Sequence, residues 1–498
     1  MSRSDAWLGG VSLAAIVLLS LFVVMMAANR PSLLSPVAHA NFYPHWMAGP
    51  LGGLLPGLTR SSKAIKYLFS GSVVVMYVGY LTILARAPRL PVRWVLGAIL
   101  AVHVIFVLAP PLALTDLFNY VNYGRMEVVH NLNPYTSIPI LEPHSDPSFA
   151  LSNWHELLSP YGPLFTYLTF AVVPLGVAGS FWALKVVLAL SSLSIIALVW
   201  HCAKLLGRNQ VRAVAIVGLN PVVLVWGLGG DHNDFLMVLF IMLGFYLLLV
   251  DRLRVREAPA HEAPADEVAL SGWHAWRAHL SAPEIFAGAA FVTAAAIKAS
   301  GAVLIPVVLA SVLRRRRALW QVLGGMVVAG ILLGALSVAA FGLHVPDLST
   351  QSKLVTGESL PNLLGLAIGA GGESETLHHL LSGVLVLSVL GCCWIAYRAG
   401  DASVGVDDDR AMAAAGWASI ALLVTLSWVL PWYVLWVLPL TALSSSKRLR
   451  RASLVFGAYL IIAWAPASGL LWNAIGFHPE NTSLGRLHQR IVRELLNF

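Results

Sequence analysis

Long apolar stretches recur along the whole chain of 498 residues, and they constrain its fold more than any other feature. Each runs for about 17–25 residues, the length that an α-helix needs to cross the hydrocarbon core of a bilayer. Inside a bilayer the backbone must satisfy its own hydrogen bonds, so such segments form helices. Hydrophobic residues make up 58% of the chain and charged residues only 11%. The sequence therefore predicts an all-α polytopic membrane protein.

The basic residues set the expected orientation of this protein in the membrane. The formal net charge is +8, but the Lys and Arg residues lie in short loops between apolar stretches, so we expect no nucleic-acid partner. The densest clusters are 314–317 and 447–451, and 86–93 and 252–256 support them. If these clusters are cytoplasmic, the amino terminus is inside and Asp116 faces the outside.

About 13 membrane-crossing segments are expected under this topology. We predict spans at 7–28, 65–85, 94–114, 182–204, 211–229, 234–250, 318–341, 377–397, 411–426, 428–443 and 452–475. Two further stretches, 284–297 and 300–313, are too short for ordinary spans and are predicted to form a hairpin of half-helices. Residues 161–175 are apolar enough to enter the membrane, and we interpret them as a partial or re-entrant element because a full crossing would place the basic loop at 204–212 outside.

The chain is predicted to form one integral-membrane domain over residues 1–498. Three polar segments, 28–64, 116–160 and 342–376, would face the outside and could build a site there. Residues 251–283 contain the run EAPAHEAPADE and are expected to be a flexible cytoplasmic insert. The three cysteines show no metal or disulfide spacing, and no nucleotide-binding motif is present.

Asp116 is the leading candidate for a catalytic residue because a carboxylate at the mouth of a membrane span is costly to desolvate. In a helix, one face would carry Asp116, Asn119, Tyr120, Tyr123, Glu127 and His130, and the opposite face would be apolar. This pattern predicts an amphipathic helix along the membrane surface. The alternative is that Asp116 only caps the helix.

Three more groups are candidates for binding. The segment GLGGDHNDF breaks an apolar hairpin with Asp231, His232, Asn233 and Asp234, which could contact sugar hydroxyls or, alternatively, cap the next helix. Lys298 lies at the break between the half-helices and is expected to bind a phosphate or to snorkel to the membrane interface. The segment WVLPWYVLW, with Trp432 and Tyr433, could line a lipid groove or a sugar platform, or belong to an interfacial aromatic belt.

The order of these motifs resembles a known family. An Asp-led helix ending in NPY is followed by YGPL, NP…GGDHND, AAAIK…P and LPWYVLW. This set is similar to the GT-C type, polyprenol-phosphate-mannose-dependent α-1,6-mannosyltransferases of actinobacteria, over residues 115–440. The resemblance implies a GT-C glycosyltransferase-like bundle with a catalytic Asp in its first large outer loop, matched here by Asp116. It also implies a polyprenyl-phosphate mannose donor and an extracytoplasmic site in the plasma membrane.

The chemistry expected of such a site follows from its residue types. A carboxylate can take the proton of an acceptor hydroxyl while the glycosyl–phosphate bond breaks, and a single carboxylate favours inversion of configuration. Lys298 or Arg125 could stabilise the departing phosphate. The expected substrate contacts are Asn119, Tyr120, Tyr123, Tyr161, Asp231, His232, Asn233, Asp234, Trp432 and Tyr433. A lipid-linked glycan would be the acceptor, in contact with membrane lipids. No cofactor is expected, and the single Asp argues against a metal.

A secondary transporter or flippase is the competing class of protein. Broken helices, an intramembrane lysine and mid-chain glycines also occur in transporters. However, the sequence shows no clear internal repeat, and its polar residues gather toward one membrane face instead of mid-depth. We therefore favour the glycosyltransferase.

Overall fold

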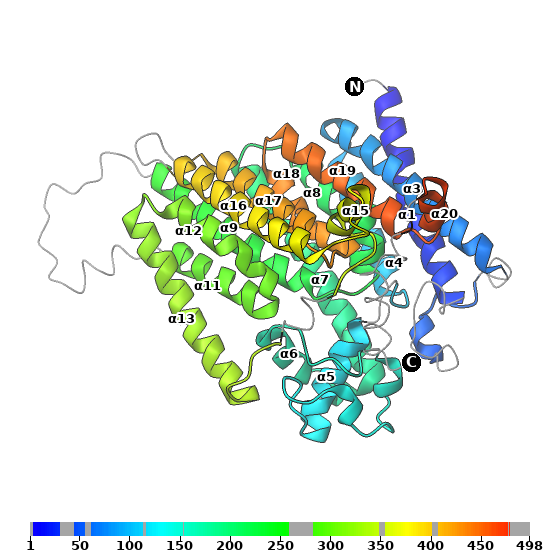
Figure 1. Ribbon diagram of the computed structural model, residues 1–498. Coiled ribbons are helices and arrows are strands. Elements are labelled where there is room, and N and C mark those ends of the chain that lie inside the picture. The colour runs from blue at the N-terminus through cyan, green and yellow to red at the C-terminus, as the bar shows by residue number, and fades with distance from the viewer. Residues whose placement is uncertain are drawn as a thin grey trace, which may run out of the picture.

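The structure is a computed structural model that describes residues 3–29, 44–54, 61–112, 116–152, 154–257, 282–347, 354–400, 407–476 and 478. These residues form helices and no strands, which confirms the all-α prediction for the described part of the chain. Most of the predicted insert at 251–283, namely 258–281, lies outside the described residues. Figure 1 shows the helices as one bundle, with the amino-terminal helices on one flank.

Six helical segments are long and apolar enough to cross a membrane, and a bent pair could be a seventh. They belong to α1 (Arg3–Asn29), α3 (Ser62–Arg86), α7 (Gly176–Leu205, extended by α6), α9 (Asp234–Glu257), α13 (Arg316–Phe341) and α16 (Glu375–Ala399), and the bent pair is α19 (Lys447–Trp464) with α20 (Ser468–Ala474). This result is consistent with a polytopic membrane protein, but it does not confirm the count of about 13.

The other elements are short and lie between these helices. The α-helices are α4 (Val92–Val107), α5 (Asp116–His130), α6 (Pro163–Phe170), α8 (Gln210–Gly218), α11 (Ala282–Ile297), α12 (Ile305–Val312), α15 (Leu360–Ala367), α17 (Asp408–Thr425) and α18 (Leu438–Leu443). The 3₁₀ turns are η1 (His45–Ala48), η2 (Ala87–Arg89), η3 (Pro139–Leu141), η4 (Phe149–Leu151), η5 (Val173–Leu175), η7 (Ala299–Leu304) and η8 (Pro431–Trp436), and η6 (Val223–Leu228) is a π-helix.

Four predicted spans are interrupted where the sequence contains proline. The span 94–114 ends as α-helix at Val107 before Pro110 and Pro111, and the span 211–229 changes from α8 to η6 around Pro221. Pro431 opens η8 instead of continuing a helix, and the chain bends by 92° between α19 and α20 around Pro466. Proline lacks an amide donor and clashes with the preceding turn, so each of these spans is broken instead of continuous.

The two half-helices are present, and the chain changes direction between them. Lys298 has an extended backbone (φ −152°, ψ 126°) between α11 and η7, which leads into α12. Arg315 just after α12 lies 3.8 Å from Glu284 at the start of α11, so the chain returns to the end at which it entered. Helix α11 also packs closely on α13, because a Cβ atom at Gly288 would lie 2.0 Å from the Val322 carbonyl oxygen.

The element predicted at 161–175 is too short to cross the membrane. Helix α6 has eight residues, which corresponds to about 12 Å of rise, and it joins α7 through η5. Figure 1 places α5 and α6 together at one end of the molecule, while α8 and α18 lie toward the other. That second end contains the α7–α8 and α18–α19 turns and the start of α17, which are linked by an Arg208–Asp409 ion pair and a bond from the Ser445 amide to Asp409.

Candidate active site

The candidate site forms where the interrupted elements meet. The backbone amide of Leu112 donates to the Gly229 carbonyl at 2.7 Å, and that of Gly162 donates to Ile297 at 3.0 Å. The amide of Asn233 donates to the Tyr120 hydroxyl at 3.2 Å. These bonds join the start of α5, the turn between η6 and α9 and the break at Lys298. Segments far apart in the sequence are thereby held against one another.

A pocket of about 450 Å³ opens at this junction. Its polar and aromatic lining residues include Asp116, Tyr123, Tyr161, Lys298, Tyr433 and Trp436. Its apolar lining residues include Val303, Leu354, Leu422, Leu426, Trp428 and Leu430. Among the described residues that line it, Asp116 is the only carboxylate. The pocket therefore combines one acid, one cation and a largely apolar wall.

Asp116 begins helix α5 and contacts a buried histidine. Its Oδ2 atom lies 3.2 Å from Nδ1 of His232, whose side chain is fully buried, whereas 17% of the Asp116 side chain is exposed. The His232 ring stacks on Trp432 with centroids 3.4 Å apart and planes 8° apart. Asp116 is the first residue of α5, and this position suits a carboxylate both as a base and as a helix cap.

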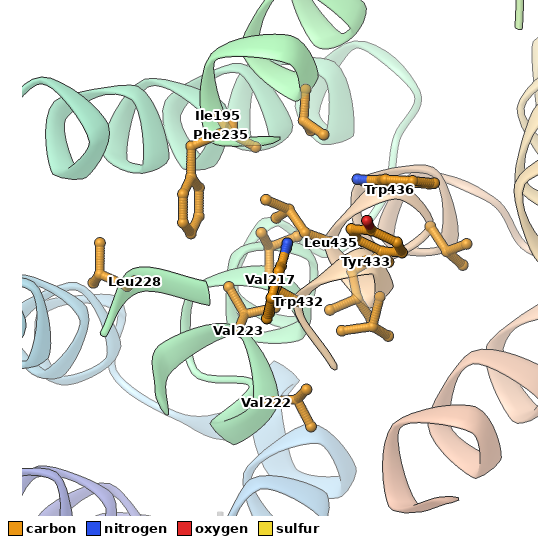
Figure 2. Packing of buried hydrophobic residues seen from close by; sticks show 14 of the residues in the cluster. Ile195, Val217, Val222, Val223, Leu228, Phe235, Trp432, Tyr433, Leu435 and Trp436 are labelled. Atoms are coloured by element: carbon orange, nitrogen blue, oxygen red, sulfur yellow. The ribbon is translucent and has the colours of Figure 1, made fainter. Parts of the chain in front are cut away.

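Trp432 itself is held by the interrupted segments. In Figure 2 it lies beside Val217 and Val223, while Tyr433 and Trp436 point away from it on the same turn of η8. The Tyr433 and Trp436 rings stack on each other at 4.2 Å. Trp436 lines the pocket and Trp432 does not. The aromatic run is therefore divided between a buried support for His232 and a wall of the pocket.

Asp231 forms an ion pair with Lys185, which was not predicted from the sequence. Lys185 from the middle of α7 donates to Asp231 at 2.6 Å, and both side chains are at least 98% buried. Asp231 has a positive φ of 56°, which is uncommon outside glycine, asparagine and aspartate. The ion pair fixes the residue that precedes His232. Lys185 is a lone lysine in an apolar helix, and this signal is the same one that identified Lys298.

Lys298 reaches the pocket but is also paired. Its Nζ donates to both carboxylate oxygens of Asp234, at 2.8 and 3.0 Å, and lies over the Tyr433 ring at 4.8 Å. Asp234 accepts a further bond from the Trp436 indole at 2.6 Å. The Lys298 side chain remains 20% exposed and lines the pocket. An ammonium group has three donors, so one N–H is left for a ligand.

The remaining predicted contacts surround this core. Tyr120 packs edge-on against Tyr161 at 4.8 Å, and the Tyr123 hydroxyl donates to the Leu157 carbonyl at 2.6 Å. Tyr123, Tyr161 and Tyr433 line the pocket. Asn119 and the four residues 231–234 are buried, and none of the five lines the pocket. They lie behind the lining residues, so their positions suit support of the site better than direct contact with a sugar.

Arg125 is placed away from the pocket, in contrast to the expected phosphate contact. Its guanidinium donates to both oxygens of Asp146, at 2.8–3.2 Å, and His130 also contacts Asp146 at 2.8 Å. Burial raises the pKa of Asp146, but bonds from Arg125, Ser148 and His130 outweigh burial and hold the pKa well below its usual range. Arg125 thus orders the loop that covers α5.

Helix α5 is more buried than an amphipathic surface helix. Every residue from Leu117 to Gly124 is buried, so the prediction that its polar face lies in solvent is wrong for these turns. The polar face instead packs on the loop after it: the Tyr123 hydroxyl donates to the Leu157 carbonyl, and the Trp154 amide donates to the Asn119 side chain. The helical spacing of the residues correctly predicted a helix here. That spacing does not reveal that a loop covers the polar face of the helix.

The buried Glu142 carboxyl predicts a pH dependence of stability. Burial raises its pKa to about 7 from 4.5. Between these values the unfolded chain loses the proton while the folded protein keeps it, so stability should fall as the pH rises from about 4.5 to about 7. Glu142→Gln should flatten this part of the profile, measured as the apparent Tm of the purified protein. A slope unchanged by the substitution would contradict the assignment to Glu142.

Among the described residues, no three His, Cys, Asp or Glu side chains converge so as to hold a metal ion. The polar groups at the pocket are instead paired with one another or with backbone. Lys185 and Trp154 were not anticipated from sequence, and Trp154 lines the pocket together with Trp436 of the WVLPWYVLW segment.

Comparisons with known proteins show the family of this chain. Residues 6–314 match the family described as "Alpha-(1->6)-mannopyranosyltransferase, N-terminal domain", and residues 357–477 match the MptB C-terminal domain. The chain is 27% identical over 380 residues to Alpha-(1->6)-mannopyranosyltransferase A of Mycobacterium tuberculosis, covering 72% of this chain and 67% of that protein. No solved structure matches the chain significantly.

Two further relatives have similar names. A protein of Corynebacterium glutamicum, also named Alpha-(1->6)-mannopyranosyltransferase A, is 29% identical over 160 residues, which are 30% of this chain and 31% of that protein. A "Probable alpha-(1->6)-mannopyranosyltransferase" of Mycolicibacterium smegmatis is 25% identical over 395 residues, which are 73% of this chain and 67% of that protein. The family match covers more than half of the chain, from α1 to the end of α12. The chain therefore belongs to the α-(1→6)-mannopyranosyltransferase family and is a mannosyltransferase, as the resemblance of its motifs predicted.

Proposed function

We propose that the protein transfers mannose, with inversion, from a polyprenyl-phosphate donor to a lipid-linked glycan acceptor, and that Asp116 is the general base. The observation that carries this proposal is the pocket, in which one carboxylate lies with one lysine beside a largely apolar wall. The names of the relatives support an α-(1→6) linkage in the product.

The apolar lining supports a lipid-linked donor. Val303, Leu422, Leu426 and Leu430 offer hydrocarbon surface to a polyprenyl chain, and burial of apolar surface is favourable at about 25 cal/mol per Å². A soluble sugar nucleotide has no hydrocarbon chain to bury against this apolar surface. Lys298 is the cation for the donor phosphate. Two of its N–H groups pair with Asp234, and the third can donate a hydrogen bond to a phosphate oxygen.

Asp116 supports the reaction as a proton acceptor. The acceptor hydroxyl oxygen attacks C1 of the mannose while the C1–O bond to phosphate breaks. The hydroxyl proton passes to the Asp116 carboxylate, and the bonding electron pair leaves on the polyprenyl phosphate. His232 lies 3.2 Å from this carboxylate, and its buried ring stacks on Trp432, so His232 is placed to orient Asp116.

A single lining carboxylate favours one displacement. A retaining enzyme uses a second carboxylate as nucleophile, and no other acid of the described part of the chain lines this pocket. A β-linked donor would therefore give an α-linked product. Lys298 would stabilise the growing negative charge of the leaving phosphate.

An extracytoplasmic location of the pocket is supported by the basic residues. The turns that contain Arg208 and the 447–451 cluster lie at the end of the bundle opposite α5. Basic loops are retained in the cytoplasm, so the pocket would face outward. In a variant without native cysteines, Leu141→Cys should react with an impermeant thiol reagent in intact cells, and Arg448→Cys should not. The reverse labelling would place the pocket inside.

Reconstitution tests the proposed reaction. The purified protein in proteoliposomes would be given polyprenyl phosphate carrying radiolabelled mannose, with a short lipid-linked mannan as acceptor. Label should move to the acceptor, and GDP-mannose should not replace the lipid donor. Transfer from GDP-mannose alone, or no transfer from the lipid donor, would reject the proposal.

Lys298→Met should weaken donor binding. The lost charge-assisted contact is worth roughly 1.5–3 kcal/mol, which corresponds to about 10- to 100-fold in affinity. Lys298→Arg retains the charge and should retain part of the binding. The apparent Tm of each variant should also be measured. It separates weaker donor binding from a loss of stability caused by breaking the Lys298–Asp234 ion pair. Normal donor affinity in a folded Lys298→Met protein would remove Lys298 from the phosphate site.

A further inference from the structure

A second cavity, of about 190 Å³, lies at the opposite end of the bundle from the Asp116 pocket. It forms where the α7–α8 turn meets the α18–α19 turn. Its polar lining residues are Arg208, Asn209, Arg212, Ser444, Ser445 and Arg450. We call this cavity the arginine pocket. The proposed transfer reaction uses none of these residues.

The arginine pocket has an excess of positive charge. Arg208 is neutralised by Asp409 at 2.7 Å, and the Ser445 amide also donates to Asp409. No acidic side chain of the described residues pairs with Arg212 or Arg450, and these two charges repel each other. The Nε atoms of Arg208 and Arg212 are buried and lack a partner within the described chain. Arg212 and Arg450 thus face one cavity, and the described part of the chain supplies no acidic partner for either.

Helices α8 and α19 both begin at the arginine pocket. Helix α8 begins beside Asn209, whose side chain accepts from the Arg212 amide at 2.8 Å, and α19 begins just after Ser445 and Ser446. The amino-terminal ends of helices carry partial positive charge and favour anions. The Ser444 hydroxyl and the Asn209 side-chain amide add neutral donors, whereas the Ser445 hydroxyl already donates to Asp409. The cavity therefore matches a compact oxyanion in charge and in donors.

We propose that the arginine pocket binds a phosphate group, carried by the headgroup of an anionic phospholipid in the leaflet opposite the catalytic pocket. Guanidinium groups are well suited to phosphate because their paired N–H groups match its oxygens. Basic pockets between membrane helices at this face are typical lipid headgroup sites. Orientation in the membrane requires only exposed basic residues, such as Arg448 and Arg451. It does not require two half-buried arginines that share a cavity.

Lipid titration tests this site in the full-length protein. The purified protein in neutral detergent would be titrated with phosphatidylglycerol, with phosphatidylcholine or with inorganic phosphate, and the apparent Tm recorded. The test variant is Arg212→Gln/Arg450→Gln. The matched control is Arg448→Gln/Arg451→Gln, which also removes two positive charges, from exposed positions near the start of α19.

Phosphatidylglycerol should raise the Tm of the wild type and of the control, whereas phosphatidylcholine should not. The test variant should need about tenfold more phosphatidylglycerol, or more, for the same shift. If inorganic phosphate reproduces the shift in the wild type and not in the test variant, the site accepts free phosphate as well. Equal responses of the test and control variants, or equal effects of both lipids, would overturn the proposal. The readout is binding, so its failure would leave the proposed reaction unaffected.

Discussion

Asp116→Asn should give a folded protein whose mannosyl transfer is slower by about 10²–10⁴-fold, because loss of a general base costs roughly that much. Asparagine keeps the size of aspartate and caps helices equally well, but it cannot accept the proton. The measurement is initial rate with polyprenyl-phosphate mannose at saturating acceptor, together with apparent Tm. The loss should appear in kcat, since the carboxylate acts on the transition state.

Glu127→Gln is the matched control for this substitution. Glu127 lies on the same helix, three turns along, and does not line the pocket. It should leave the rate within a few-fold of wild type. If Asp116→Asn also stayed within a few-fold, Asp116 would be a structural residue and not the base.

Lys185→Met should destabilise the protein strongly. It would leave the buried Asp231 carboxylate without its partner, and breaking a buried pair in this way costs about 3–5 kcal/mol. Activity should fall as well, because Asp231 precedes His232, which contacts Asp116. The double variant Lys185→Met/Asp231→Asn removes both charges and should recover most of the apparent Tm.

The double variant also separates charge pairing from packing. If the pair acts through electrostatics, neutralising the second residue compensates for loss of the first. A double variant no more stable than Lys185→Met would show that the methylenes of Lys185, and not its charge, support the site. A Lys185→Met protein of normal stability and activity would show that the Lys185–Asp231 ion pair is needed neither for stability nor for activity.

Several features of this site could be predicted from sequence because their physical signals are local. Asp116 and Lys298 are charged residues at the ends of apolar runs, and desolvation makes such residues conspicuous. The break at Lys298 followed from two apolar stretches that are each too short to span. The prolines at 110, 221, 431 and 466 also indicated where helices would stop, although four continuous spans were predicted across them.

Other features depend on partners distant in sequence, which a single sequence does not reveal. Asp116 and His232 are 116 positions apart, and Lys185 and Asp231 are 46 apart. Arg125 resembled a free cation because its partner, Asp146, lies in an irregular loop. The GGDHND turn is one example, because its residues 231–234 are buried and do not line the pocket, which their local sequence does not reveal.

The central claim is a single displacement at a pocket with one carboxylate, and the configuration of the product tests it most directly. The purified enzyme would be given β-linked polyprenyl-phosphate mannose and a synthetic mannoside acceptor, and the anomeric configuration of the new bond read by NMR coupling constants. We predict an α-linked product from the wild type, at a rate that depends on Asp116. A β-linked product would mean retention and a second nucleophile, and it would contradict this account.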